Sequence, residues 1–123
     1  MTINVEKLNH IVQTFVSTTS DIQGAAIVTP DGLPLTSNLP TSMDEERASA
    51  MSAAMLALGE RIGSELVRGN IERVSVEGND GYSILTSCNQ EAVFLVLAAK
   101  SAKQGLLMLE INRTLAEIGL VLS

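Results

Sequence analysis

The chain has 123 residues, of which 46% are hydrophobic but only 2% aromatic, and its formal net charge is −6. This length predicts one domain over residues 1–123 with an aliphatic core, and the acidic balance argues against nucleic acid or an anionic membrane surface as the main partner. A single cysteine, no apolar run long enough to insert into a membrane and an N-terminus without signal-peptide features together predict a cytoplasmic protein.

The first forty residues predict a helix followed by a β-hairpin. Apolar side chains recur at helical spacing over residues 3–18. Ile22–Val28 is apolar or small on both faces, which is typical of a strand covered on both sides. The Thr29–Gly32 segment, Thr-Pro-Asp-Gly, predicts a tight turn into a second strand, Leu33–Ser37. Pro34 cannot donate a ladder hydrogen bond, so we expect this second strand at an edge of the sheet.

A long helix rich in small residues is predicted next. Ser42 with Glu45 three residues later has the pattern of a capping box, and the helix is expected to run to about Arg68. Gly59 and Gly63 indicate close approach of another backbone, which could belong to the protein's own sheet or to a partner. A bulky stripe is expected to pack on the sheet and consists of Met51, Met55, Leu58, Ile62 and Leu66.

Three strands and a final helix complete the chain. Ile71–Glu77 alternates in polarity, Tyr82–Cys88 alternates less strictly, and Ala92–Ala99 is apolar on both faces. The last helix begins at about Lys103. The element order α-β-β-α-β-β-β-α predicts an α/β sandwich, in which helices cover both faces of a mostly antiparallel five-stranded sheet. With the two fully apolar strands at the centre, the predicted strand order is 2-1-5-4-3.

The third strand, Ile71–Glu77, is therefore predicted at the second edge of the sheet. It contains neither proline nor internal glycine, so nothing in its sequence blocks pairing with another chain. One interpretation is an edge protected by its charged side chains. The other is a two-fold homodimer in which Arg73 faces Glu77 or Ser75 of the second copy.

Residue types with chemical reactivity are sparse and isolated in this sequence. His10 is the only histidine, and Cys88 has no evident base beside it, so we predict no catalytic residue, metal site or cofactor. The acidic residues Asp44, Glu45 and Glu46 are explained by the positive end of a helix dipole. No phosphate-binding loop motif is present. An arginine finger from the long helix is conceivable, although arginines on a helix are usually solvated.

Several segments together resemble the roadblock/dynein-light-chain family. They are GAAIVTPDGLPL, the helix containing DEERASA, VSVEGNDGYSIL, AVFLVLAA and GLLMLEINRTLAEI, and the likeness extends over about residues 4–120. The resemblance implies a fold related to longin and profilin. It also implies a homodimer through the third strand and the long helix. The implied interface consists of Ala50, Ala54, Ala57, Arg61, Ile71, Glu72, Arg73, Val74, Ser75 and Val76.

Family members act as partners of Ras-like small GTPases, as scaffolds or as activators of GTP hydrolysis, so the resemblance implies such a partner here. The paired long helices would form the GTPase surface, with Glu46, Arg47, Ala50 and Ala54 as contact residues. The main alternative is a small-molecule sensor or a generic dimerisation module with a profilin-like fold. The core lacks the few convergent polar groups that a ligand pocket usually shows.

Overall fold

The computed structural model describes residues 3–123 and confirms the predicted order of elements. The strands form one antiparallel sheet in the order β2-β1-β5-β4-β3, as the sequence predicts. The elements are α1 (Val5–Thr18), β1 (Ile22–Val28), β2 (Pro34–Asn38), α2 (Glu45–Glu65), β3 (Arg73–Gly78), β4 (Gly81–Cys88), β5 (Ala92–Ala98) and α3 (Gln104–Leu122).

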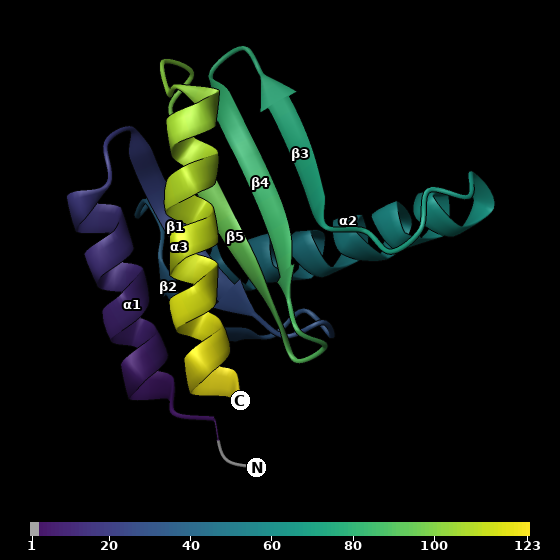
Figure 1. Ribbon diagram of the computed structural model, residues 1–123. Helices are drawn as coiled ribbons and strands as arrows, with labels where there is room; N and C mark the ends of the chain where they lie inside the picture. Colours follow the sequence, from purple (N-terminus) through teal and green to yellow (C-terminus); the bar gives the residue numbers. More distant parts are fainter. Residues whose placement is uncertain (1–2) are drawn as a thin grey trace.

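The helices are divided between the two faces of the sheet. In Figure 1, α1 and α3 lie side by side over one face, and α2 crosses the other face. The larger core cluster lies under α1 and α3. In this cluster the rings of Phe15 and Phe94 pack edge to face, with 5.3 Å between their centroids. The smaller cluster lies under α2, where Leu56 packs with Val28 and Leu95. Both predicted central strands, β1 and β5, are almost fully buried along most of their length.

The first hairpin closes as its sequence predicts. The Gly32 N–H donates to the Thr29 carbonyl oxygen at 2.9 Å, and Gly32 has φ +93°, a conformation that glycine adopts without steric cost. Pro34 begins β2, which is an edge strand as predicted. The turn lies close to α2, because a Cβ added at Gly32 would be 3.3 Å from the Ala50 Cα atom.

Both ends of α2 differ from the sequence prediction. The N-cap is Asp44 rather than Ser42, and its carboxylate accepts hydrogen bonds from the N–H groups of Glu46 and Arg47 at 2.9 and 3.3 Å. The ionised Asp44 side chain also interacts favourably with the helix dipole, so it replaces the proposed capping box. The helix ends at Glu65 rather than near Arg68. It stops because Val67 has φ +57°, which reverses the chain so that the Arg68 N–H donates to the Gly63 carbonyl oxygen at 2.7 Å.

The expectation that the bulky stripe of α2 packs on the sheet is wrong. Met51, Leu58, Ile62 and Leu66 are 59%, 59%, 46% and 62% exposed, and only Met55 is partly buried. The sheet instead contacts a face of mostly small residues, namely Ser49, Ser52, Leu56 and Gly63. Small residues let the helix axis come close to the strands, and the longer side chains are then displaced to the flank.

The two glycines of α2 are explained by contacts within the chain. A Cβ added at Gly59 would be 2.7 Å from Cγ2 of Val74, and one added at Gly63 would be 2.6 Å from Cδ1 of Ile71. These separations are shorter than real Cβ contacts, so a larger residue at either position would force neighbouring atoms to shift where α2 crosses β3 and the segment before it. Of the two interpretations that the sequence left open, close approach to the protein's own sheet is therefore confirmed. No helix within residues 3–123 combines the length and the apolarity needed to cross a membrane.

Candidate interaction surface

The outer edge of β3 presents backbone groups that pair with no other strand of residues 3–123. Gly78 and Gly81 pair across a two-residue turn and therefore exchange hydrogen bonds. Hydrogen-bonded and non-hydrogen-bonded residue pairs alternate along an antiparallel ladder, so the backbone groups of Val76 and Val74 also form hydrogen bonds with β4. It follows that Arg73, Ser75 and Glu77 direct their N–H and C=O groups away from the sheet.

The interface residues predicted before and within β3 fall into two groups. Glu72, Arg73, Ser75 and Val76 are exposed. Ile71 and Val74 are partly buried because they pack against the smaller core cluster beneath the glycines of α2. The outer edge is thus open to a partner along its backbone, while the side chains of Ile71 and Val74 are already committed to the protein's own core.

Helix α2 has three distinct faces, which at 3.6 residues per turn lie about a third of a turn apart. The first is the buried face on the sheet, described above. The second is the bulky stripe, which is apolar and largely exposed. The third carries small and charged residues, is turned away from the sheet, and is exposed at Ala50, Ala54, Ala57 and Arg61.

The third face, here called the small-residue face, contains residues predicted for both the dimer and the GTPase contact. Glu46 and Arg47 continue it toward the N-terminus of α2 and are exposed. The Arg61 side chain is 74% exposed, and its Nε atom lies 3.4 Å from Oε1 of Glu65, one turn further along α2. An exposed pair of this kind contributes little to stability, so Arg61 remains available to a partner.

An apolar groove runs along the flank of α2, and the sequence reasoning missed it. Its volume is about 300 Å³, and its walls are Met43 with the N-terminal half of α2 on one side and β3, β4 and β5 on the other. The lining residues are Met43, Ala48, Met51, Ser52, Met55, Val76, Ser83, Leu85, Leu95 and Leu97. The signal in the sequence was the presence of two apolar stripes on one helix, more than a single sheet face can cover.

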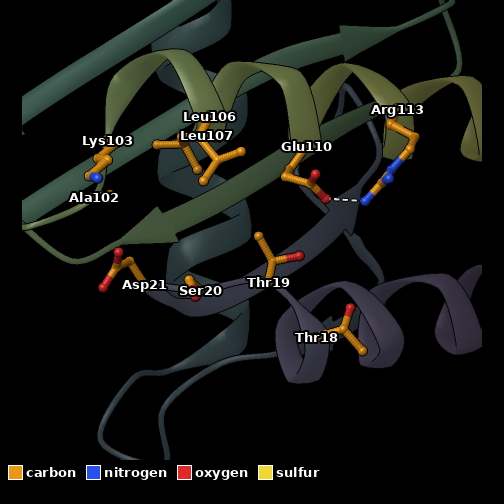
Figure 2. Close-up of a pocket in the computed structure, with 10 residues that line it drawn as sticks. All are labelled: Thr18, Thr19, Ser20, Asp21, Ala102, Lys103, Leu106, Leu107, Glu110 and Arg113. Atoms are coloured by element: carbon orange, nitrogen blue, oxygen red, sulfur yellow. Dashed lines mark hydrogen bonds and ion pairs between the residues drawn. The ribbon is translucent and has the colours of Figure 1, made fainter.

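A second, more polar depression lies between the end of α1 and the start of α3 (Figure 2). Its volume is about 440 Å³. Most of its polar groups already have partners within the chain: Glu110 pairs with Arg113, and the Asp21 carboxylate accepts a hydrogen bond from Ser101 at 3.3 Å. The Thr18 hydroxyl donates to the Thr14 carbonyl oxygen at 2.7 Å. This pairing leaves few groups free to recognise a ligand.

The two reactive residue types considered in the sequence lie apart from these surfaces. Cys88 is buried in the larger core cluster, and burial raises the pKa of its thiol to about 12. A thiol with this pKa is protonated near neutral pH and is therefore a poor nucleophile. His10 is exposed on α1. Among the residues that the structure describes, no group of three or more histidine, cysteine, aspartate or glutamate side chains could hold a metal ion.

Comparison with known proteins identifies the family. The sequence model of the Roadblock/LC7 domain matches residues 8–98. The chain belongs to the Roadblock/LC7 family. The uncharacterized protein MJ1340 of Methanocaldococcus jannaschii is 31% identical over 100 residues, covering 81% of this chain and 87% of the relative.

Solved structures show that the Roadblock/LC7 fold extends over nearly the whole chain. Myxococcus xanthus MglB is similar with a TM-score of 0.89 and 16% identity, covering 99% of this chain and 92% of MglB. A Roadblock/LC7 domain from Streptomyces avermitilis is similar with a TM-score of 0.83 and 17% identity, covering 89% and 92% of the two chains. Acanthamoeba castellanii profilin II is similar with a TM-score of 0.67 and 14% identity, covering 90% of this chain and 95% of profilin II. This similarity confirms the predicted profilin-like fold.

Proposed function

We propose that this Roadblock/LC7 protein is a cytoplasmic homodimer that binds a Ras-like small GTPase. It would regulate the GTPase as a scaffold or by stimulating GTP hydrolysis, without a catalytic residue of its own. The observation that carries the proposal is the open outer edge of β3 beside an exposed α2, in a chain of this family. An open strand edge is a template for pairing with a second copy. A structure of the related MglB is described as having a tetrameric arrangement, and this self-association supports the proposal.

The proposed dimer pairs β3 with the partner's β3 in antiparallel orientation. We place the two-fold axis at Ser75, where each Ser75 exchanges N–H and C=O hydrogen bonds with the partner's Ser75. This register uses all three residues whose backbone groups point outward, and it sets Arg73 opposite the partner's Glu77. Opposite charges across a strand pair are favourable. The register that sets Arg73 opposite the partner's Ser75 lacks this charge pairing.

The proposed GTPase surface is the N-terminal part of the small-residue face, with Glu46, Arg47, Ala50 and Ala54. These residues are exposed, and they lie on a rigid helix rather than on a loop. Alanine side chains let another protein come close to the helix, and the two charged residues supply orientation. This N-terminal part of the face carries no group suited to phosphoryl chemistry beyond Arg47, so regulation would act by holding the GTPase's own catalytic residues.

The test is binding of purified small GTPases, loaded with GDP or with a GTP analogue, to the immobilised protein. Ala54→Arg places a long charged side chain in the proposed surface, and Ala116→Arg makes the same change at an exposed position of α3. We expect wild type and Ala116→Arg to bind one nucleotide state, and Ala54→Arg to bind at least tenfold more weakly. Binding of neither state, or equal binding by Ala54→Arg, would contradict the proposal.

A further inference from the structure

A third depression lies between α3 and β3, on the face of the sheet opposite α2, and is here called the α3–β3 depression. Its volume is about 460 Å³. In Figure 1, α3 lies over the middle of the sheet, and no helix of residues 3–123 lies in front of β3. The depression therefore opens to solvent along the flank of α3. Its lining includes Arg73 of β3, Thr86 of β4, Asn89 of the turn after β4 and Asn112 of α3.

Thr86 contributes a buried hydroxyl group without a partner. Ile84 and Cys88, two residues before and after it on β4, belong to the core cluster under α1 and α3, so Thr86 lies on that same face of the sheet. Thr86 is only 7% exposed. Its hydroxyl oxygen is the only buried side-chain nitrogen or oxygen atom of residues 3–123 that makes no hydrogen bond. Such a group is costly, so its place in the lining of a depression indicates a partner from outside the chain.

Arg73 places an unpaired positive charge beside this hydroxyl. The two residues are directly opposite each other in the pairing of β3 with β4. Because the backbone groups of Arg73 point away from β4, this is a non-hydrogen-bonded pair, in which the two side chains lie closest together. Arg73 is exposed and forms no ion pair within residues 3–123. A guanidinium group and a hydroxyl group, both able to donate, therefore stand side by side.

Two amide side chains complete a set of donors from four separate segments. Asn112 is exposed on α3, and Asn89 is exposed in the turn after β4. Guanidinium, hydroxyl and amide groups together suit an oxyanion, which accepts several hydrogen bonds at once. The sequence did not reveal this convergence, because the four residues are brought together only by the sheet and the final helix.

The remaining lining residues indicate which oxyanion fits. Glu72 is exposed at the same depression, and its negative charge repels a doubly charged phosphate more strongly than a singly charged carboxylate. Ile71 and Leu115 also line the depression and are partly buried. They offer apolar contact to the part of a ligand that follows its charged group.

We propose that the α3–β3 depression binds the carboxylate of a small molecule that has a short aliphatic part. The guanidinium of Arg73 pairs with the carboxylate, and the Thr86 hydroxyl and the Asn112 amide donate hydrogen bonds to its oxygen atoms. Hydrogen bonds between arginine and a carboxylate are charge-assisted and often bidentate, so they are stronger than neutral ones. The inference goes beyond the proposed function, because the whole site belongs to one chain and lies across the sheet from α2.

The site is compatible with the proposed β3 pairing. That pairing sets Arg73 opposite the partner's Glu77. Within its own chain, however, Glu77 already forms an ion pair with Lys100 at 2.5 Å. A guanidinium group has five N–H donors, so Arg73 can contact a ligand and the partner subunit at the same time.

NMR titration of the isotope-labelled full chain tests the proposal. The probe is sodium butyrate, added at constant ionic strength because salt screens exposed charges. Butyramide has the same shape without the charge, and inorganic phosphate is the competing class of oxyanion. Butyrate should shift the backbone amide signals of Thr86 and Asn112 in a saturable way. Butyramide and phosphate should bind at least tenfold more weakly.

Four variants assign the binding to particular groups. Arg73→Gln should weaken butyrate binding at least tenfold, and Lys7→Gln, which removes the same charge from an exposed position of α1, should leave it unchanged. Thr86→Val should weaken binding at least fivefold, whereas Thr86→Ser, which keeps the hydroxyl, should bind within about twofold of wild type. The dispersion of each NMR spectrum shows whether the variant is folded.

Three results would overturn the site. They are the absence of a saturable shift with butyrate, equal binding of butyramide, and unchanged binding by a folded Arg73→Gln variant. Phosphate binding as tight as that of butyrate would overturn the assignment to a carboxylate. None of these results bears on GTPase binding, which is measured separately on α2.

Discussion

Replacing Gly63 with alanine adds one methyl group where α2 crosses the segment that precedes β3. The new Cβ would lie 2.6 Å from Cδ1 and 3.1 Å from Cγ1 of Ile71, and 2.7 Å from the carbonyl oxygen of Gly69. Rotation of the Ile71 side chain can relieve the first contact. The contact with Gly69 involves backbone, so either α2 or the loop after it must move.

Two opposing terms set the size of the effect. Alanine is better than glycine in a helix interior by about 1 kcal/mol. Overpacking a close contact costs about 1–3 kcal/mol. The net expectation is that the free energy of unfolding falls by about 0–2 kcal/mol. Gly119→Ala is the matched control, because Gly119 also lies in a helix but an added Cβ meets nothing within 4 Å. That variant should gain up to about 1 kcal/mol, so the two should differ by about 1–3 kcal/mol.

Urea unfolding followed by circular dichroism, at one fixed protein concentration, measures both variants. A fixed concentration is needed because the stability of the proposed dimer would depend on it. Gly63→Ala should unfold at lower urea than wild type or close to it, and Gly119→Ala at higher urea. If Gly63→Ala were as stable as Gly119→Ala, the close approach of α2 to the Ile71 segment would be incorrect.

Three other predictions test particular contacts. Asp44→Ala should cost about 1 kcal/mol because it removes an N-cap that accepts two backbone hydrogen bonds, whereas Ser42→Ala should have no measurable effect in the same thermal melts. Cys88, whose thiol pKa is raised to about 12, should react with a thiol reagent at neutral pH only after unfolding. Because the pKa is higher in the folded chain, the thiol's contribution to the free energy of unfolding should be constant below about pH 9 and fall as the pH rises toward 12. Cys88→Ala should abolish that pH dependence. Thr86→Val should leave stability unchanged or raise it by up to about 1 kcal/mol, because the buried Thr86 hydroxyl has no hydrogen-bond partner among residues 3–123, and a marked loss would show that a partner exists.

The sheet could be predicted from the sequence because its signals are local. Strands apolar on both faces identify the centre, Pro34 identifies one edge, and the Thr29–Gly32 turn fixes the first hairpin. The strand order then follows from the short connections. Helix ends were less predictable because two candidate caps, Ser42 and Asp44, lie within one turn, and the Asp44 carboxylate is the one that accepts the first free N–H groups of α2.

The orientation of α2 could not be predicted, for a physical reason. The bulky stripe is the most apolar face of the helix, and burial of such a face against the sheet is the usual expectation. Close approach at Gly59 and Gly63 reverses that choice, since the sheet accepts Ser49, Ser52 and Leu56 and leaves the bulky stripe outside. The apolar groove results from the same reversal, so it too depends on a distance between elements that the sequence does not encode locally.

The most direct test of the account is the mass of the protein in solution when the free edge of β3 is blocked. Ser75→Pro removes an N–H that points away from β4, so the fold of the single chain should survive, and Ser75→Ala retains the N–H as the control. By light scattering, wild type and Ser75→Ala should have twice the 13.0 kDa mass of the chain, and Ser75→Pro the mass of one chain with an unchanged circular dichroism spectrum. A folded Ser75→Pro dimer, or a monomeric wild type, would contradict the claim that β3 joins the two copies.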